Sequence, residues 1–509
     1  MKKIKILSYI VAICPLLFAS TSCNKWLDVI SDDEVFEDDA FSSTKGYRSA
    51  LIGIYKTVAS SSLYGQELTW GLKSTMSWNY QSGYSATAYR TILSEKTTDN
   101  TAGKNIADKI WSKAYYAIAN CNELLQQIEG CEDEFEYSWE KSMIMAEARG
   151  LRGLLHFELL QLFVPAPVTG YTGTALPYVT TYPDLKPEYK SMSDYLALVI
   201  EDLKYAQETL APIDIDELRN KSHFVSGSIR LDNMDYVLFQ AVGNIHSDGA
   251  KRDNAYGDGF FAYRGYRFNY WSATGLLARV YSYMRDFDNA ETYASTIIDD
   301  WVVDYQFNLY SSNPKAATNP ARVDGKRRPE PILAFWNDQV CDDYVSVVGT
   351  SYDRMVELKY LFAGDLTTDY RYTDLYNTSN KRYRVWDESD DRTVSKYSNP
   401  LLPAMELPEV YYIKAECLAQ KGDISGADAL LQKVRNARGC TAALGDTDLE
   451  SFMNTLVNEA QRDFLTRGTT FCFLKKFDWP VIYNGTPAGW TVPEGWYVLP
   501  IPDSETAYY

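Results

Sequence analysis

Residues 415–434 read AECLAQKGDISGADALLQKV, and this stretch decides the fold. Residues 278–297, ARVYSYMRDFDNAETYASTI, repeat its pattern at one constant offset. The shared order is a small residue, a large residue, an Asp-containing turn, and alanine at the close contact of a second helix. The matched positions are Ala278, Tyr281, Asp286, Ala290, Ala294 and Ile297 against Ala415, Leu418, Asp423, Ala427, Leu431 and Val434. This spacing predicts tetratricopeptide-type hairpins, in which alanine lets two helices approach closely.

Helical periodicity also precedes these two hairpins. Residues of about 107–128 and 139–163 predict a third, more divergent hairpin, whose second helix is stopped by Pro165 and Pro167. A further helix is expected over 194–210. The stretches 213–268 and 305–400 are polar and predict long loops, apart from a β-like run at 331–336. We therefore expect a mainly α fold, with hairpins forming a right-handed solenoid frame packed against a loop-rich ligand-binding face with little β.

Composition limits the function. The chain has 509 residues and a formal net charge of −18, which argues against binding DNA or RNA. Three histidines make a His-rich metal site or a His-dependent catalytic triad improbable. No G-x-S-x-G, H-E-x-x-H or P-loop motif occurs, so we assign no catalytic or metal residues and do not expect an enzyme. Counting acids does not exclude a glycosidase carboxylate pair.

No cofactor is expected. Asp248, Asp253 and Asp258 could contact Ca²⁺, but their spacing fits no EF-hand, and a solvated loop is favoured.

The N-terminus carries an export signal. Lysines among residues 1–5 precede an apolar run to about Ala19, and Ser20-Thr21-Ser22 leads to Cys23. We expect residues 1–22 to be a lipoprotein signal peptide and Cys23 to be acylated. The alternative is an ordinary secretory signal in which Cys23 is incidental. Removal of 1–22 takes three lysines and no acids, so the mature net charge is about −21.

The mature chain is expected to begin with a tether. Acidic residues make 23–44 a solvated connection from lipid to domain, and no other stretch is apolar enough to span a bilayer. Of the six cysteines left, Cys121 and Cys131 are the nearest pair, and at most one or two disulfides are expected.

One segment combines aromatic rings with hydrogen-bonding side chains. Sugar binding needs flat rings for the C–H side of pyranoses and polar groups for the hydroxyls. The glycine and serine at 82–85 favour an exposed loop, although a single aromatic residue is more often core. The candidates are Trp70, Trp78, Asn79, Tyr80, Tyr84 and Arg90, with Gln81 and Tyr89 beside them.

Several motifs resemble the SusD/RagB family. They are EARGLR at 147–152 followed by a proline loop, the segments 415–419 and 434–439, the closing run WYVLPIPDSE at 496–505, and Cys23 followed by Trp26-Leu27-Asp28. These matches extend over nearly the whole mature chain. The sequence departs from the family near 462–468, where Arg467 occupies a usually acidic slot and Thr470 a usual arginine slot.

The resemblance implies a surface-exposed, lipid-anchored outer-membrane protein of Bacteroidetes-type bacteria. Such proteins have an N-terminal part, here 45–270, and a C-terminal part, here 271–509, expected as one compact unit. They capture an oligosaccharide, pass it to a SusC-like TonB-dependent β-barrel, and are not enzymes.

The resemblance also implies that loops after the first clear hairpin complete the ligand face. These loops add Tyr305, Asn308, Tyr310, Asn313 and Trp336, with Trp386 as a weaker candidate. A peptide-capturing RagB-like lipoprotein and a tetratricopeptide protein–protein scaffold are the alternatives.

Overall fold

The structure is a computed structural model. It describes residues 41, 43–81, 87–131, 135, 137–217, 260, 264–300, 307–309, 325–327, 329–352, 355–379, 381–386 and 400–506. Cys23, the signal segment and the three aspartates considered for Ca²⁺ lie outside these ranges. Residues Arg48–Tyr509 form one compact unit, to which the contacts below belong.

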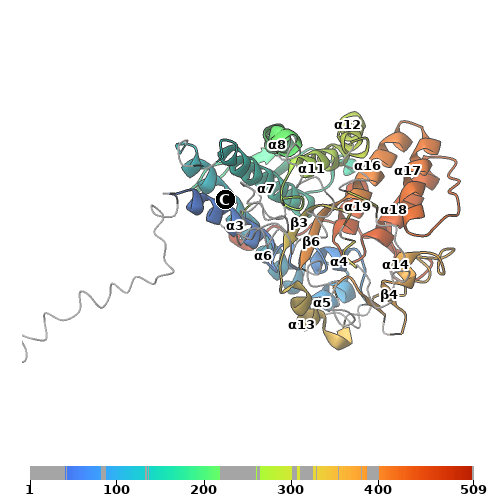
Figure 1. Cartoon of the computed structure of the whole chain (residues 1–509). Helices are drawn as coiled ribbons and strands as arrows, with labels where there is room; N and C mark the ends of the chain where they lie inside the picture. The colour runs from blue at the N-terminus through green and yellow to red at the C-terminus, as the bar shows by residue number, and fades with distance from the viewer. Residues whose placement is uncertain are drawn as a thin grey trace, which may run out of the picture. The chain divides into compact units, whose positions relative to one another are not determined.

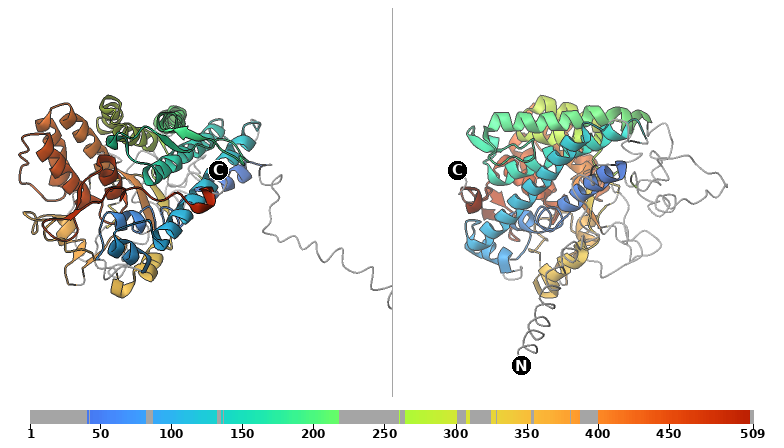
Figure 2. Two further views of the ribbon diagram at one scale, coloured as in Figure 1. Left: turned by 180° about the vertical axis from the view of Figure 1, so that it is seen from behind. Right: turned by 90° about the vertical axis from the view of Figure 1, so that its left-hand side faces the viewer.

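Helix hairpins follow one another through this unit, as expected. Consecutive neighbours pack together in the order α6, α7, α8, α11, α12, α16 and α17, and Figure 1 shows this succession from α7 to α17. Figure 2 shows α8 lying along α7. The bounds are α6 Thr101–Ile128, α7 Glu140–Phe163, α8 Met192–Ala211, α11 Tyr270–Tyr283, α12 Phe287–Ile298, α16 Leu407–Gln420 and α17 Ile424–Ala437. The mainly α solenoid prediction is confirmed.

The repeated aspartate is a helix cap. Asp286 accepts a hydrogen bond from Asn289 N at the start of α12, and Asp423 accepts one from Gly426 N at the start of α17. These bonds satisfy backbone donors that the first turn of a helix leaves without partners. The matched alanines, Ala290 and Ala427, are fully buried. The repeat in the sequence therefore encodes both the turn and the close helix contact.

The EARGLR motif also has a packing role. A Cβ on Gly150 would lie 2.2 Å from the ring of Phe268, so only glycine fits where α7 meets this residue. Arg467, in the usually acidic slot, is buried and donates to the carboxylate of Glu406. Thr470 donates through Oγ1 to Phe464 O at 3.0 Å. The core thus accommodates both departures from the family pattern.

The remaining elements surround this frame. The β-like run forms β3, which pairs antiparallel with β6. Part of the stretch expected as loops is helical, because α13 occupies 340–352. The bounds are α3 Thr44–Val58, α4 Leu72–Met76, α5 Thr87–Glu95, β1 Thr174–Pro177, β2 Tyr189–Ser191, β3 Pro331–Trp336, α13 Val340–Tyr352, α14 Tyr370–Thr373, β4 Tyr376–Asn377, β5 Arg382–Tyr383, β6 Leu401–Glu406, α18 Leu449–Asp463, α19 Thr469–Phe477, β7 Val481–Ile482, β8 Trp490–Thr491 and α20 Asp503–Thr506, with short helical turns at Pro167–Thr169 and Pro212–Glu217.

The structure also bears on the predictions about membrane spans and disulfides. No described helix is both long and apolar enough to cross a bilayer. The six cysteines that follow Cys23 form no disulfide in the structure, so Cys121 and Cys131 are not joined.

Candidate functional site

The segment 70–80, expected as an exposed loop, is buried. Trp70 is 0% exposed, and its Nε1 donates to Gly65 O at 2.9 Å. Tyr80 is also buried and donates through its hydroxyl to Trp70 O at 2.7 Å. Successive turns and the short helix α4 fold the rings inward while the backbone receives their polar atoms. The exposed-loop interpretation is therefore wrong for this segment.

Trp78 lies in a cluster of three tryptophans. Its backbone adopts a φ of 56°, and the residue is 8% exposed. The ring centroid lies 4.3 Å from that of Trp490 and 6.0 Å from that of Trp496. Asn79 accepts through Oδ1 from Thr466 N at 3.0 Å. These contacts with residues near the C-terminus make Trp78 and Asn79 structural in the described conformation.

The rest of the predicted aromatic cluster lies partly on α5. Tyr89 is buried and donates to the Glu67 carboxylate at 3.1 Å, and burial raises the pKa of Glu67 to about 7. Arg90 is half-buried. Tyr84 lies outside the described residues. In this part of the prediction, Arg90 and the neighbouring candidate Gln81 are thus both half-buried.

The ligand residues predicted from the loops after the first clear hairpin also differ in exposure. Tyr305, Tyr310 and Asn313 lie outside the described residues, and Asn308 is half-buried. Trp386, the weaker candidate, is fully buried, with Lys326 Nζ 3.1 Å from its ring centroid, so its ring does not face solvent. Trp336 is 42% exposed at the end of β3. Trp336 is therefore the one predicted ligand-binding tryptophan that the structure leaves open to solvent.

The structure adds a groove that the sequence reasoning missed. It has a volume of about 550 Å³, within the range of ligand pockets, and lies between α6 and the connection from β1 to β2. The side chains that border it include Trp111, Tyr115, Tyr182, Asp184, Lys186 and Glu505, along with Pro177, Pro183 and Pro187. Residues 177–187 form one wall of the groove. The three prolines within these eleven residues were the one local feature of the sequence that predicted a non-helical segment here.

Side chains of α6 fix this wall in place. Tyr115 donates to Pro177 O at 2.9 Å, Asn122 donates to Val179 O at 3.1 Å, and Gln126 donates to Tyr182 O at 2.9 Å. The amide of Tyr182 in turn donates to Gln126 Oε1. Positions 115, 122 and 126 share one face of the helix, because they are spaced by about two turns and one turn. The groove is therefore preformed.

A buried network of polar side chains lies behind the groove wall and stabilises it. His156 stacks on Tyr178 with centroids 3.8 Å apart, and its Nε2 accepts from Val179 N at 3.3 Å. Burial lowers the pKa of His156 to about 3, so the ring is neutral near pH 7. Burial opposes ionisation of Asp202, yet the bidentate Arg152 guanidinium holds the pKa of this carboxyl below its usual value. These groups stabilise the groove and do not line it.

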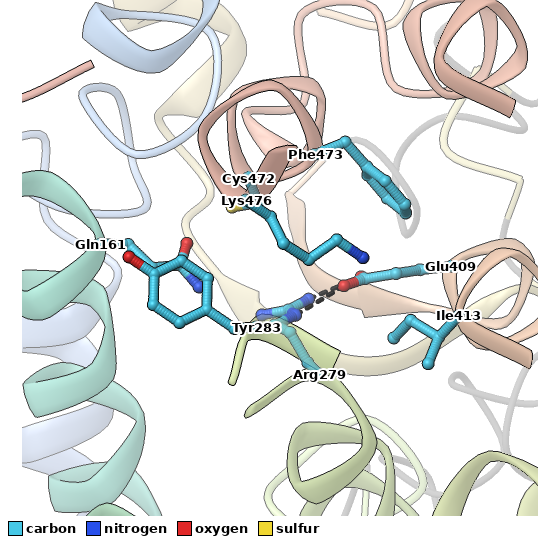
Figure 3. Close-up of a pocket in the computed structure, with 8 residues that line it drawn as sticks. All are labelled: Gln161, Arg279, Tyr283, Glu409, Ile413, Cys472, Phe473 and Lys476. Carbon is cyan, nitrogen blue, oxygen red and sulfur yellow. Dashed lines mark hydrogen bonds and ion pairs between the residues drawn. The ribbon is translucent and has the colours of Figure 1, made fainter. Parts of the chain in front are cut away.

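A second cavity, of about 10 Å³, lies among α7, α11, α16 and α19 and is too small for a sugar. Arg279 makes a bidentate ion pair with Glu409 in its wall, with both contacts at 2.6 Å (Figure 3). Lys476, on the facing helix, is paired with Glu416. The ion pairs identify this cavity as a packing feature of the core.

The described residues offer no metal site, since no cluster of three or more His, Cys, Asp and Glu side chains occurs among them. Asp463, a buried acid of the C-terminal half, is paired with Arg327 and Arg438. Burial would raise the pKa of Asp463, but Arg438 and Arg327 hold it well below its usual value. Asp463 therefore remains ionised and does not suit general acid catalysis.

Comparison with known proteins agrees with this architecture. Residues 25–226 match the model of a SusD-like family described as starch-binding and associating with the outer membrane. A curated SusD-like protein P25 of Formosa agariphila is 26% identical over 219 residues. That match covers 41% of this chain, and the chain spans only 38% of the length of that relative.

Solved structures share the fold over most of the chain. A SusD superfamily protein from Bacteroides thetaiotaomicron has a TM-score of 0.61 and 17% identity, covering 91% of this chain and 98% of its own. A SusD-like carbohydrate binding protein from Bacteroides vulgatus has a TM-score of 0.62 and 16% identity, covering 91% and 96%. The N-terminal part thus matches a SusD-like family in sequence. The chain shares its fold with solved SusD superfamily proteins over most of its length.

Proposed function

We propose that this protein captures oligosaccharides at the cell surface and delivers them to a SusC-like TonB-dependent barrel without transforming them. The observation that carries the proposal is the match of residues 25–226 to a family described as starch-binding and outer-membrane-associated. Acylation of Cys23 would hold the protein at the outer membrane, and the acidic segment that follows would let it reach its ligand. The two alternative functions, peptide capture and protein scaffolding, have no comparable support.

The chemistry of the accessible residues is consistent with capture. Trp336 presents a large ring at the end of β3, and such a ring can cover the apolar C–H face of a pyranose. Arg90 and Asn308, two further predicted ligand residues, are half-buried and so partly accessible. A neutral sugar also suits the acidic chain, since a polyanionic glycan would be repelled by a net charge of about −21 in the mature protein.

Binding measurements test the proposal. The mature chain is titrated by calorimetry with maltoheptaose and screened on an array of plant, host and microbial glycans, with a peptide library in parallel. We expect at least one neutral glycan to bind, and Trp336→Ala to weaken that binding about tenfold or more. Tyr360→Ala is the matched control, because Tyr360 is likewise 42% exposed and should leave affinity unchanged. Binding of peptides alone, or of no glycan, would contradict the proposal.

Delivery is tested separately. Purification of the lipidated protein from its native outer membrane should bring a TonB-dependent barrel with it. Purification without such a barrel, together with unchanged glycan uptake in a deletion strain, would argue against the transport step and leave capture standing.

A further inference from the structure

We propose that the groove between α6 and residues 177–187 is a second oligosaccharide site, which shares no residue with the Trp336 position. The inference rests on the proposed glycan capture and extends it to a surface that no sequence motif marked. The groove has a volume of about 550 Å³ and is open on one side, which leaves room for a bound sugar chain.

The rings in the groove can cover sugar faces. Tyr182 is 40% exposed, and Tyr115 is half-buried beside it in the lining. Trp111 is buried against Phe163 in an edge-on contact with centroids 5.0 Å apart, so it closes the groove floor. Both tyrosines line the groove and offer apolar ring faces to a sugar. The Tyr115 hydroxyl is bonded to Pro177 O, which holds its ring in place.

The charges in the lining favour a neutral ligand. Asp184 and Lys186 stand on the same connection, and Glu505 faces them from α20. The hydroxyl of Tyr189 donates to Glu505 Oε1 at 3.3 Å, which holds this carboxylate at the groove wall. Two acids and one base give donors and acceptors for hydroxyl groups, but no cluster of one sign that would select a phosphate, a sulfate or a polycation.

The backbone of the wall argues against a peptide. An extended peptide commonly binds by adding a strand to free backbone groups. Here the carbonyls of Pro177, Val179 and Tyr182, and the amide of Tyr182, are already bonded to side chains of α6. Asn122 also reaches Thr181 O at 3.3 Å. Recognition must therefore use ring faces and side chains, as in sugar binding.

The preformed wall also keeps the ordering cost of binding low. The α6 bonds and the buried His156–Tyr178 stack hold the connection in place without ligand. A rigid site loses less conformational entropy on binding than a loop that must order.

The experiment compares stoichiometries. Whichever neutral glycan of the panel binds the mature chain is titrated by calorimetry, and two sites per chain are expected. Tyr182→Ala should remove one site, Trp336→Ala the other, and the double variant both. Tyr182→Phe should restore binding because it keeps the ring. Tyr116→Ala is the control, since Tyr116 is 56% exposed on α6 but does not border the groove.

The outcomes separate the two proposals. If Trp336→Ala abolishes all binding and Tyr182→Ala changes neither affinity nor stoichiometry, the groove proposal is wrong while glycan capture stands. A peptide that binds the mature chain and is lost in Tyr182→Ala overturns the sugar assignment of the groove. Absence of any glycan binding to the unmodified chain overturns both proposals.

Discussion

Two aromatic segments of this chain, 70–80 and 177–187, differ in solvent exposure. The first contains two tryptophans and a tyrosine, has glycine and serine close by, and is nevertheless buried. The second is bounded and divided by prolines, and it presents Tyr182 and Leu185 to solvent, the latter at 92% exposure. The two segments differ in which groups make hydrogen bonds with their backbone.

The first segment and the turns before it bond mainly to their own backbone and fold inward with their rings, as in the bond from Leu68 N to Leu63 O. The second bonds to side chains of α6 and remains on the surface of that helix. Since every buried backbone group needs a partner, the source of those partners decides which rings can face a ligand.

The largest effect should follow loss of a buried ring. Trp70→Ala removes a fully buried indole whose N–H donates to Gly65 O, so the free energy of unfolding should fall by about 3–5 kcal/mol. Urea denaturation followed by circular dichroism measures this change. Tyr182→Ala is the comparison and should alter it by less than about 0.5 kcal/mol. Equal losses in the two variants would remove the distinction between the segments.

A smaller effect should come from the histidine beneath the groove. The pKa of His156 is lowered by burial to about 3, against about 6.5 in the unfolded chain. Between these values the unfolded state binds a proton that the folded state does not, so stability falls as pH falls through this window. From pH 6 to pH 4 this proton accounts for about 2–3 kcal/mol.

His156→Gln tests that contribution, because glutamine can bond to Val179 but cannot become protonated in this range. Stability of the variant and the unmodified chain is measured by urea denaturation at pH 6 and pH 4. The variant should lose about 2–3 kcal/mol less between the two values, while other acid-sensitive groups affect both proteins alike. Parallel pH profiles would show that His156 is not buried in its neutral form.

Much of the frame could be predicted because its signals are local. Asp286 and Asp423 act three residues along the chain, and the alanines contact a helix that directly follows or precedes them. Helix α13 was missed because valines, threonine and glycine in 340–352 have low helix propensity. Its helicity therefore depends on contacts outside the segment, which periodicity does not reveal.

The site was harder to predict because its determinants are distant in sequence. Trp78 was taken as accessible, yet the rings that cover it, Trp490 and Trp496, follow about four hundred residues later. The groove likewise unites α6, the 177–187 connection and Glu505. Exposure of an aromatic residue depends on such long-range packing, so local composition wrongly placed several of these residues at the surface.

The smallest effect should come from the bond that links α6 to Tyr182. Gln126 is exposed and makes reciprocal contacts with the Tyr182 amide and carbonyl. Gln126→Ala should lower the free energy of unfolding by only about 1 kcal/mol, since exposed hydrogen bonds contribute little net stability. Its local consequence should be larger, because the Tyr182 amide loses its acceptor.

Hydrogen exchange of that amide gives the decisive readout. If α6 holds the connection on its surface, exchange at Tyr182 should accelerate several-fold in Gln126→Ala while amides of the buried segment 70–80 stay unchanged. Ser112→Ala, an exposed change on the same helix, should leave both regions unaffected. Unchanged exchange at Tyr182 would mean that the wall is held by the buried network alone. The stiffness of the groove would then depend on His156 and Tyr178, and only their replacement would open it.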